Sequence, residues 1–78
     1  MSNQFRNLEI EAPQFCIEGL MRELSGFGAF VKGMANKSSL HIVHVAIPSN
    51  HVGALEAWLS VASNGVGRIV GNEPAKDA

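Results

Sequence analysis

The sequence predicts an α+β domain with the element order β-α-β-β-α-β, in which two helices cover one face of a four-stranded antiparallel sheet. Three patterns lead to this fold class. Residues 7–12 alternate between apolar and polar side chains, which is typical of a half-buried strand. Residues 13–25 and 49–62 repeat apolar residues at helical spacing, and residues 39–47 are rich in the branched side chains that favour strands.

The first half of the chain predicts one strand and one helix. Leu8, Ile10 and Ala12 share one face of the strand 7–12, and polar residues occupy the other. Pro13 suits the first turn of a helix, where its missing N–H group is not needed. The helix then runs to Ser25, and we expect Gly26 to end it as a left-handed cap.

The middle of the chain predicts a hairpin. Residues 28–34 form a glycine-weakened strand, residues 35–38 are turn-like, and residues 39–47 form the clearest strand of the chain. Both faces of this strand are largely apolar, with Leu40, Ile42 and Ala46 on one side. A strand that is apolar on both faces is expected to be buried on both.

The last part predicts a second helix capped by Ser49 or Asn50, with Val52, Leu55, Leu59 and Ala62 facing inward and Trp58 and Val61 alongside. Asn64-Gly65 ends it, residues 66–70 return as a short strand, and residues 72–78 are expected to fray.

This order of elements is the ferredoxin-like plan, which leaves one face of the sheet uncovered. The strand 39–47 would be central, so its second face needs a cover that one chain does not provide. We therefore expect a homo-oligomer, a dimer or trimer, with Leu40, Ile42 and His44 at the interface.

Length and composition place further limits. The 78 residues make one domain, with an ordered core of about 7–71, and a core this small gives marginal stability. Six basic and seven acidic residues leave a net charge of -1 without a basic stripe, which argues against a nucleic-acid partner. No apolar run is long enough for a membrane span or a signal peptide, and the lone cysteine suits a reducing compartment, so we expect a cytoplasmic protein.

No residue is predicted to be catalytic, and no metal or cofactor is expected. His41 and His44 are three apart on a strand and therefore face opposite sides, which predicts surface, interface or capping roles. Cys16 lies on an apolar helix stripe and is expected in the core. Glu9 and Glu11 share a strand face, which can be a carboxylate pair but more often is a solvated face.

The glycine-rich segment 65–71 is the strongest candidate for a binding site. Glycines between a helix and a strand let the backbone approach an anion, and the Arg68 guanidinium can bind phosphate oxygens. We therefore predict Gly65, Gly67 and Arg68 as ligand-binding residues for a small anion. The alternative interpretation is a helix cap followed by a tight turn.

Two resemblances accompany these residues. Residues 40–70 resemble the second half of the P-II-type signalling superfamily and its copper-tolerance (CutA-type) relatives, whose junction G-D-G-K-I-F-V is similar to Gly65 through Val70 here. That resemblance implies trimers of ferredoxin-like subunits and a nucleotide-phosphate contact at Arg68. Residues 55–69, with Leu55, Glu56 and Trp58 before Gly65-Val66-Gly67-Arg68-Ile69, resemble a small phage anti-CRISPR family. This second resemblance implies a domain that binds a protein through a surface.

Three function classes remain open at this point. The first is a non-enzymatic ferredoxin-like module that self-associates and binds a small ligand or regulates a partner protein. The second is a phage or mobile-element inhibitor that blocks a host protein complex. The third is a small dimeric α/β-barrel-type enzyme, which the absence of a convincing acid, base or nucleophile set disfavours.

Overall fold

The computed structural model describes residues 4–75, and its strands and helices follow the predicted order. The strands form one antiparallel sheet in the order β2-β3-β1-β4, with β1 and β3 at its centre, which confirms the predicted fold class. The elements are β1 (Phe5–Pro13), a short 3-10 turn (Gln14–Cys16), α1 (Ile17–Gly26), β2 (Phe30–Lys37), β3 (Leu40–Pro48), a second 3-10 turn (Ser49–His51), α2 (Val52–Ala62) and β4 (Arg68–Pro74).

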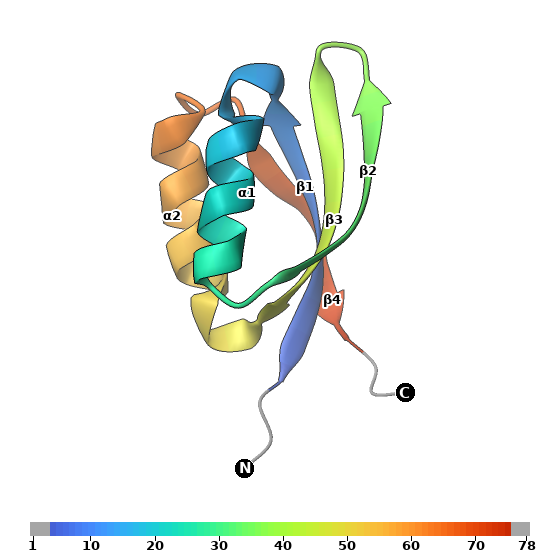
Figure 1. The fold of residues 1–78 in the computed structure, drawn as a ribbon, viewed down its shortest axis with the longest axis vertical. Helices are drawn as coiled ribbons and strands as arrows, with labels where there is room; N and C mark the ends of the chain where they lie inside the picture. Colours follow the sequence, from blue (N-terminus) through green and yellow to red (C-terminus); the bar gives the residue numbers. More distant parts are fainter. Residues whose placement is uncertain (1–3, 76–78) are drawn as a thin grey trace.

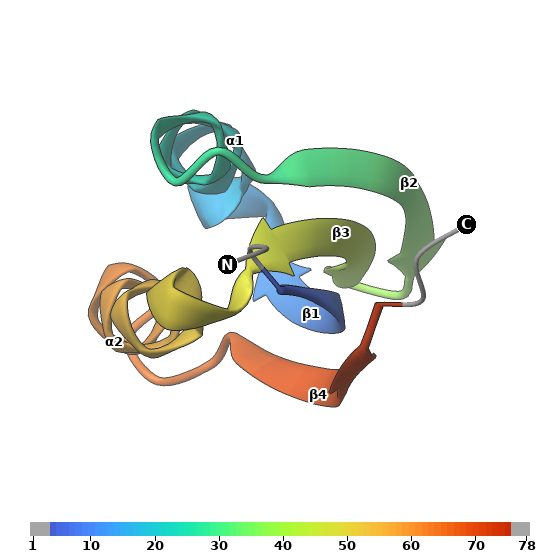
Figure 2. The same cartoon turned by 90° about the horizontal axis from the view of Figure 1, so that it is seen from below.

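Both helices lie on the same side of the sheet, and no helix or strand of residues 4–75 covers the other side (Figures 1 and 2). The core fills the space between the two layers. Its buried side chains come from alternate positions of β1 and β3 and from one stripe of each helix: Leu8, Ile10, Ala12, Cys16, Leu20, Leu24, Val43, Val45, Ile47, Leu55 and Leu59.

The register between β1 and β3 separates the two faces of the sheet. Leu8 pairs with Val45 and Ile10 with Val43, and all four side chains are buried beneath the helices. The intervening residues point to the uncovered side, where Glu9 lies opposite His44. Side-chain alternation therefore places Leu8, Ile10 and Ala12 of β1 in the core and its two glutamates on the uncovered face.

The end of the first helix differs from the prediction. α1 begins at Ile17 rather than Pro13, after the 3-10 turn, and the residue that follows it, Phe27, keeps a right-handed conformation. Gly28, with φ of 74°, is the left-handed residue, so Gly26 is not the cap that we predicted. The Ala29 N–H donates a hydrogen bond to Leu24 O at 2.9 Å, across the end of the helix. The chain can make this hydrogen bond only because the backbone reverses direction at Gly28.

The hairpin is also displaced along the chain. β2 starts later than the predicted strand 28–34 and includes Ala35, Asn36 and Lys37, which we expected in the turn. These residues pair with Ile42, His41 and Leu40 of β3, so cross-strand pairing outweighs their local turn preference. The turn itself is Ser38-Ser39, with Ser38 at a φ of 59°.

The second helix and the last strand need three corrections. Neither Ser49 nor Asn50 caps α2 with its side chain, because both belong to the 3-10 turn, where the Ser49 N–H donates to Gln4 O at 2.8 Å. Val61 is 80% exposed rather than close to the inward stripe. β4 begins at Arg68 and reaches Pro74, so residues 72–74 are paired with β1 instead of frayed, and residues 76–78 lie outside the described residues.

Candidate functional site

The uncovered side of the sheet, called the open face below, gathers polar and apolar side chains from all four strands. On β3, Leu40, Ile42 and Ala46 are half-buried, whereas His44 is exposed. The three residues predicted for an interface, Leu40, Ile42 and His44, therefore lie together on this face. At one end of it, the rings of Phe5 and Phe30 stack with their centroids 6.1 Å apart.

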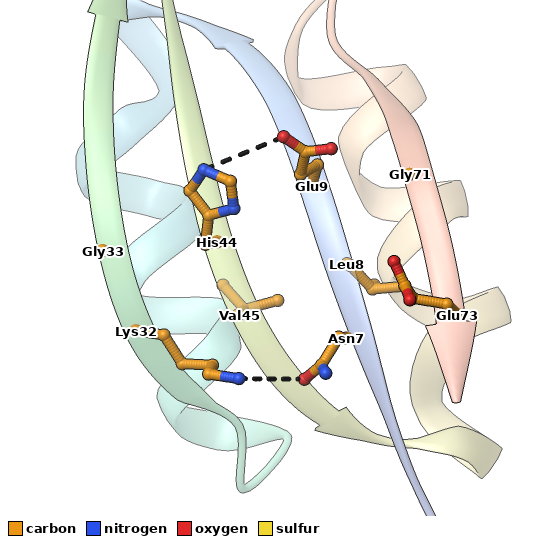
Figure 3. A pocket seen from close by; sticks show the side chains of 9 residues that line it. All are labelled: Asn7, Leu8, Glu9, Lys32, Gly33, His44, Val45, Gly71 and Glu73. Carbon is orange, nitrogen blue, oxygen red and sulfur yellow. Dashed lines mark hydrogen bonds and ion pairs between the residues drawn. The ribbon is translucent and has the colours of Figure 1, made fainter. Parts of the chain in front are cut away.

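A groove with a volume of about 530 Å³ crosses the middle of the open face (Figure 3). Its floor is formed by β1 and β3, and its sides are the edge strands β2 and β4. Polar side chains from three strands line it: Asn7 and Glu9 from β1, His44 from β3 and Glu73 from β4. Lys32 of β2 also lines it, so the groove combines acidic, basic and amide groups.

One row of paired residues across the sheet explains why the groove is hollow. Glu9 lies between His44 and Gly71, and Gly33 pairs with His44 on the far side. Both edge strands thus place a glycine beside the charged pair, and the pairing shifts register next to each of these glycines. A Cβ at Gly71 would lie 2.9 Å from Glu9 Oε1, so any side chain there would displace the carboxylate.

The charged groups of the groove are paired weakly within the protomer. His44 Nε2 lies 3.8 Å from Glu9 Oε2, and the two side chains are 47% and 49% exposed. Lys32 Nζ donates to Asn7 Oδ1 at 3.3 Å and so reaches over the open face (Figure 3). An exposed ion pair such as Glu9–His44 contributes little to folding, about 0–1 kcal/mol, and both of its groups remain available to another charged group.

The predicted anion site has a different geometry from the one expected. The Gly65 N–H donates to Ser60 O at 2.8 Å, and the Gly67 N–H donates to Ser63 Oγ at 2.7 Å. Both groups therefore close the turn after α2. Arg68 Nε lies 3.5 Å from Glu11 Oε1 on the open face, and its side chain is 73% exposed. The assignment of Gly65, Gly67 and Arg68 as ligand-binding residues stays a prediction.

The remaining histidines and the cysteine are separate from the groove. His41 points to the helix side, where its Nε2–H donates to the Gln14 side chain, and the His51 ring stacks on Phe27 with centroids 5.4 Å apart. Within residues 4–75, no three His, Cys, Asp or Glu side chains gather closely enough to hold a metal ion. Cys16 lies in the core, and burial raises the pKa of its thiol.

Sequence reasoning found some of these residues and missed others. Glu9, Glu11 and His44 were recognised from strand alternation, although each glutamate pairs with a basic group rather than with the other. Lys32 lies inside the predicted strand 28–34, but it falls at the register shift between Val31 and Gly33, which alternation does not reveal. Glu73 was missed because the last strand was predicted to end at residue 70. Gly33 and Gly71 could have indicated this part of the sheet, since a glycine inside a strand often marks a bulge or a close approach of another group.

Comparison with known proteins gives the fold alone. No family model matches the chain, and no curated protein matches it significantly. Among 99 matching chains of solved structures is the crystal structure of ttk003000868 from Thermus thermophilus, with a TM-score of 0.71 and 22% sequence identity. The match covers 94% of this chain and 12% of that one, so the similarity is to a small part of a much longer protein.

This similarity supports a small α+β fold, and the two family resemblances stay predictions. Among the described residues, no helix has the length and hydropathy needed to cross a membrane.

Proposed function

We propose that this protein is a small non-catalytic module that acts by self-association through the open face of its sheet. The observation that carries the proposal is the unequal burial of the central strand β3. Its core side is fully covered, with Val43, Val45 and Ile47 at 0–1% exposure. Its other side presents Ile42 and two further apolar residues that are only half-buried.

The burial of apolar side chains favours a protein surface as the cover of the open face. Both helices lie on the core side, so residues 4–75 supply no layer for the open face (Figure 2). Full burial of an exposed apolar side chain contributes about 1.5–3 kcal/mol, and each of these half-buried side chains contributes part of that when a partner covers it. A second copy brings its own apolar open face to this contact and also enlarges a core that is small for an independent domain.

The groove also fits a binding surface better than a catalytic centre. Its Glu9–His44 pair is about half exposed, and the groove that contains it lies on the uncovered side of the sheet. Small-molecule sites are typically enclosed and bury most of the ligand. We therefore assign Glu9 and His44 to association rather than to proton transfer.

The direct test is the oligomeric state of the tag-free protein. Size-exclusion chromatography with light scattering at tens of micromolar should give at least twice the mass of one protomer. A protomer mass across the whole concentration range would disprove self-association, and the open face would then be a surface for a different protein.

A matched pair of variants locates the contact. Ile42→Lys places a charge at the centre of the open face and should weaken association about tenfold or more, because it removes an apolar contact and adds a desolvated charge. Val61→Lys changes an 80% exposed residue on α2 and should leave association unchanged. Circular dichroism checks that both variants remain folded.

A further inference from the structure

Charge on the open face is divided between its two halves. The half formed by β2 and β3 carries the basic groups Lys32, Lys37 and His44. The half formed by β1 and β4 carries the acidic groups Glu9, Glu11 and Glu73, together with Arg68, which is paired with Glu11. The face is therefore positive towards the β2 edge and negative towards the β4 edge.

The strand register aligns these charges in rows across the sheet. Asn7 of β1 pairs with Glu73 of β4, and Lys32 donates to Asn7 from the β2 side. This row therefore has a positive charge at its β2 end and a negative charge at its β4 end. Figure 3 shows Lys32 and Glu73 on opposite sides of the groove. The next row contains Gly33, His44, Glu9 and Gly71. Within residues 4–75, neither Lys32 nor Glu73 takes part in an ion pair.

These rows restrict how two copies can meet face to face. Homodimers are usually two-fold symmetric, and stacked sheets keep their strands within about 30° of each other. A two-fold axis parallel to the strands, between β3 and β1, places β2 of one copy over the partner's β4. A two-fold axis across the strands instead places β2 over the partner's β2, which sets lysines against lysines.

Building on the proposed self-association, we infer that two copies dock about an axis parallel to their strands, with Lys32 against the partner's Glu73 and His44 against the partner's Glu9. This arrangement forms each charge pair twice. It also sets Gly33 over the partner's Gly71, where neither residue has a side chain to hold the sheets apart. Apolar contacts of β3 supply the affinity, and the Lys32–Glu73 contacts specify the register.

Charge reversal tests this register. Lys32→Glu and Glu73→Lys each set like charges against each other twice in a homodimer, so each variant should self-associate about tenfold or more weakly than the wild type. An equimolar mixture of the two variants should recover the wild-type affinity, because both contacts of the mixed dimer again join a lysine to a glutamate. The double variant Lys32→Glu/Glu73→Lys should recover it as well, since it restores opposite charges at both contacts.

Arg22→Glu on α1 and Glu56→Lys on α2 make the same kinds of charge change on exposed helical residues and should leave association unchanged. Analytical ultracentrifugation at low and moderate salt gives the dissociation constants. Undiminished association of the single variants, or no recovery in the double variant, would overturn the inferred register while leaving self-association intact. A monomeric wild type would overturn both.

Discussion

Ser63 ties the end of α2 to the start of β4 through one buried hydroxyl. Its side chain is 0% exposed, its Oγ donates to Leu59 O at 2.6 Å, and the same oxygen accepts from the Gly67 N–H at 2.7 Å. A Cβ at Gly67 would lie 3.0 Å from both Leu59 Cδ1 and Ser63 Oγ. The glycine is therefore required by close packing against the helix.

This contact predicts the effect of removing the hydroxyl. Ser63→Ala leaves the Gly67 N–H buried without a partner, which should lower the free energy of unfolding by about 1–3 kcal/mol. Ser60→Ala, on the exposed side of α2, should change it by less than about 0.5 kcal/mol. Urea denaturation measures both, and equal stabilities of the two variants would show that the Ser63 hydrogen bonds contribute nothing.

The contacts of the segment 65–71 could not be predicted from its residue types. Glycines and an arginine suit an anion site as well as a turn. In the folded chain, Ser63 Oγ accepts a hydrogen bond from the Gly67 N–H, and Ser60 O accepts one from the Gly65 N–H. Glu11 lies beside Arg68. Glu11 and Arg68 are on strands at opposite ends of the sequence, so local spacing carries no information about this pair.

At the scale of elements, Gly28 after α1 and Gly53 inside α2 differ in backbone conformation, although neither is crowded by neighbouring atoms. Neither Gly28 nor Gly53 has a neighbouring atom within 4 Å of the position that a Cβ would take, but Gly28 has a φ of 74° and Gly53 is helical. A side chain at either position meets no steric clash with its neighbours. The two substitutions therefore differ in the backbone energy alone.

Gly28→Ala should lower the free energy of unfolding by about 1–2 kcal/mol, because a left-handed conformation is strained for alanine. Gly53→Ala should raise it by about 0.4–1 kcal/mol, because alanine restricts the unfolded chain and favours the helix. Thermal and urea unfolding give the comparison. A stabilising Gly28→Ala would mean that the chain does not reverse at this residue.

Edge strands were the elements whose bounds were hardest to predict. β2 is exposed along almost its whole length, including Phe30, Val31 and Met34 at 44–65% exposure. Strand propensity is weak without burial, so its residues alone do not reveal where it starts and ends. Pairing with the central strand β3 decides its bounds, and the same holds for β4 against β1.

For the whole molecule, the proposed self-association links folding to protein concentration. A partner that binds only the folded state raises its stability by mass action. With an unfolding enthalpy of about 0.7 kcal/mol per residue, the midpoint of thermal unfolding should rise by up to about 5 °C for each tenfold increase in protein concentration. Differential scanning calorimetry from about 10 to 1000 µM measures this shift, and an unchanged midpoint would contradict a dimer that stabilises the fold.

The amino-acid sequence by itself determined the fold class, the order of the elements and which face of β1 and of β3 enters the core. Alternation on strands and three-to-four spacing on helices are local patterns, so Leu8 and Leu55 were placed correctly in the core. Tertiary structure alone decided the extent of the edge strands and the row that sets Gly33 and Gly71 beside His44 and Glu9. These features depend on pairing between residues that are distant in the chain, which no local pattern encodes.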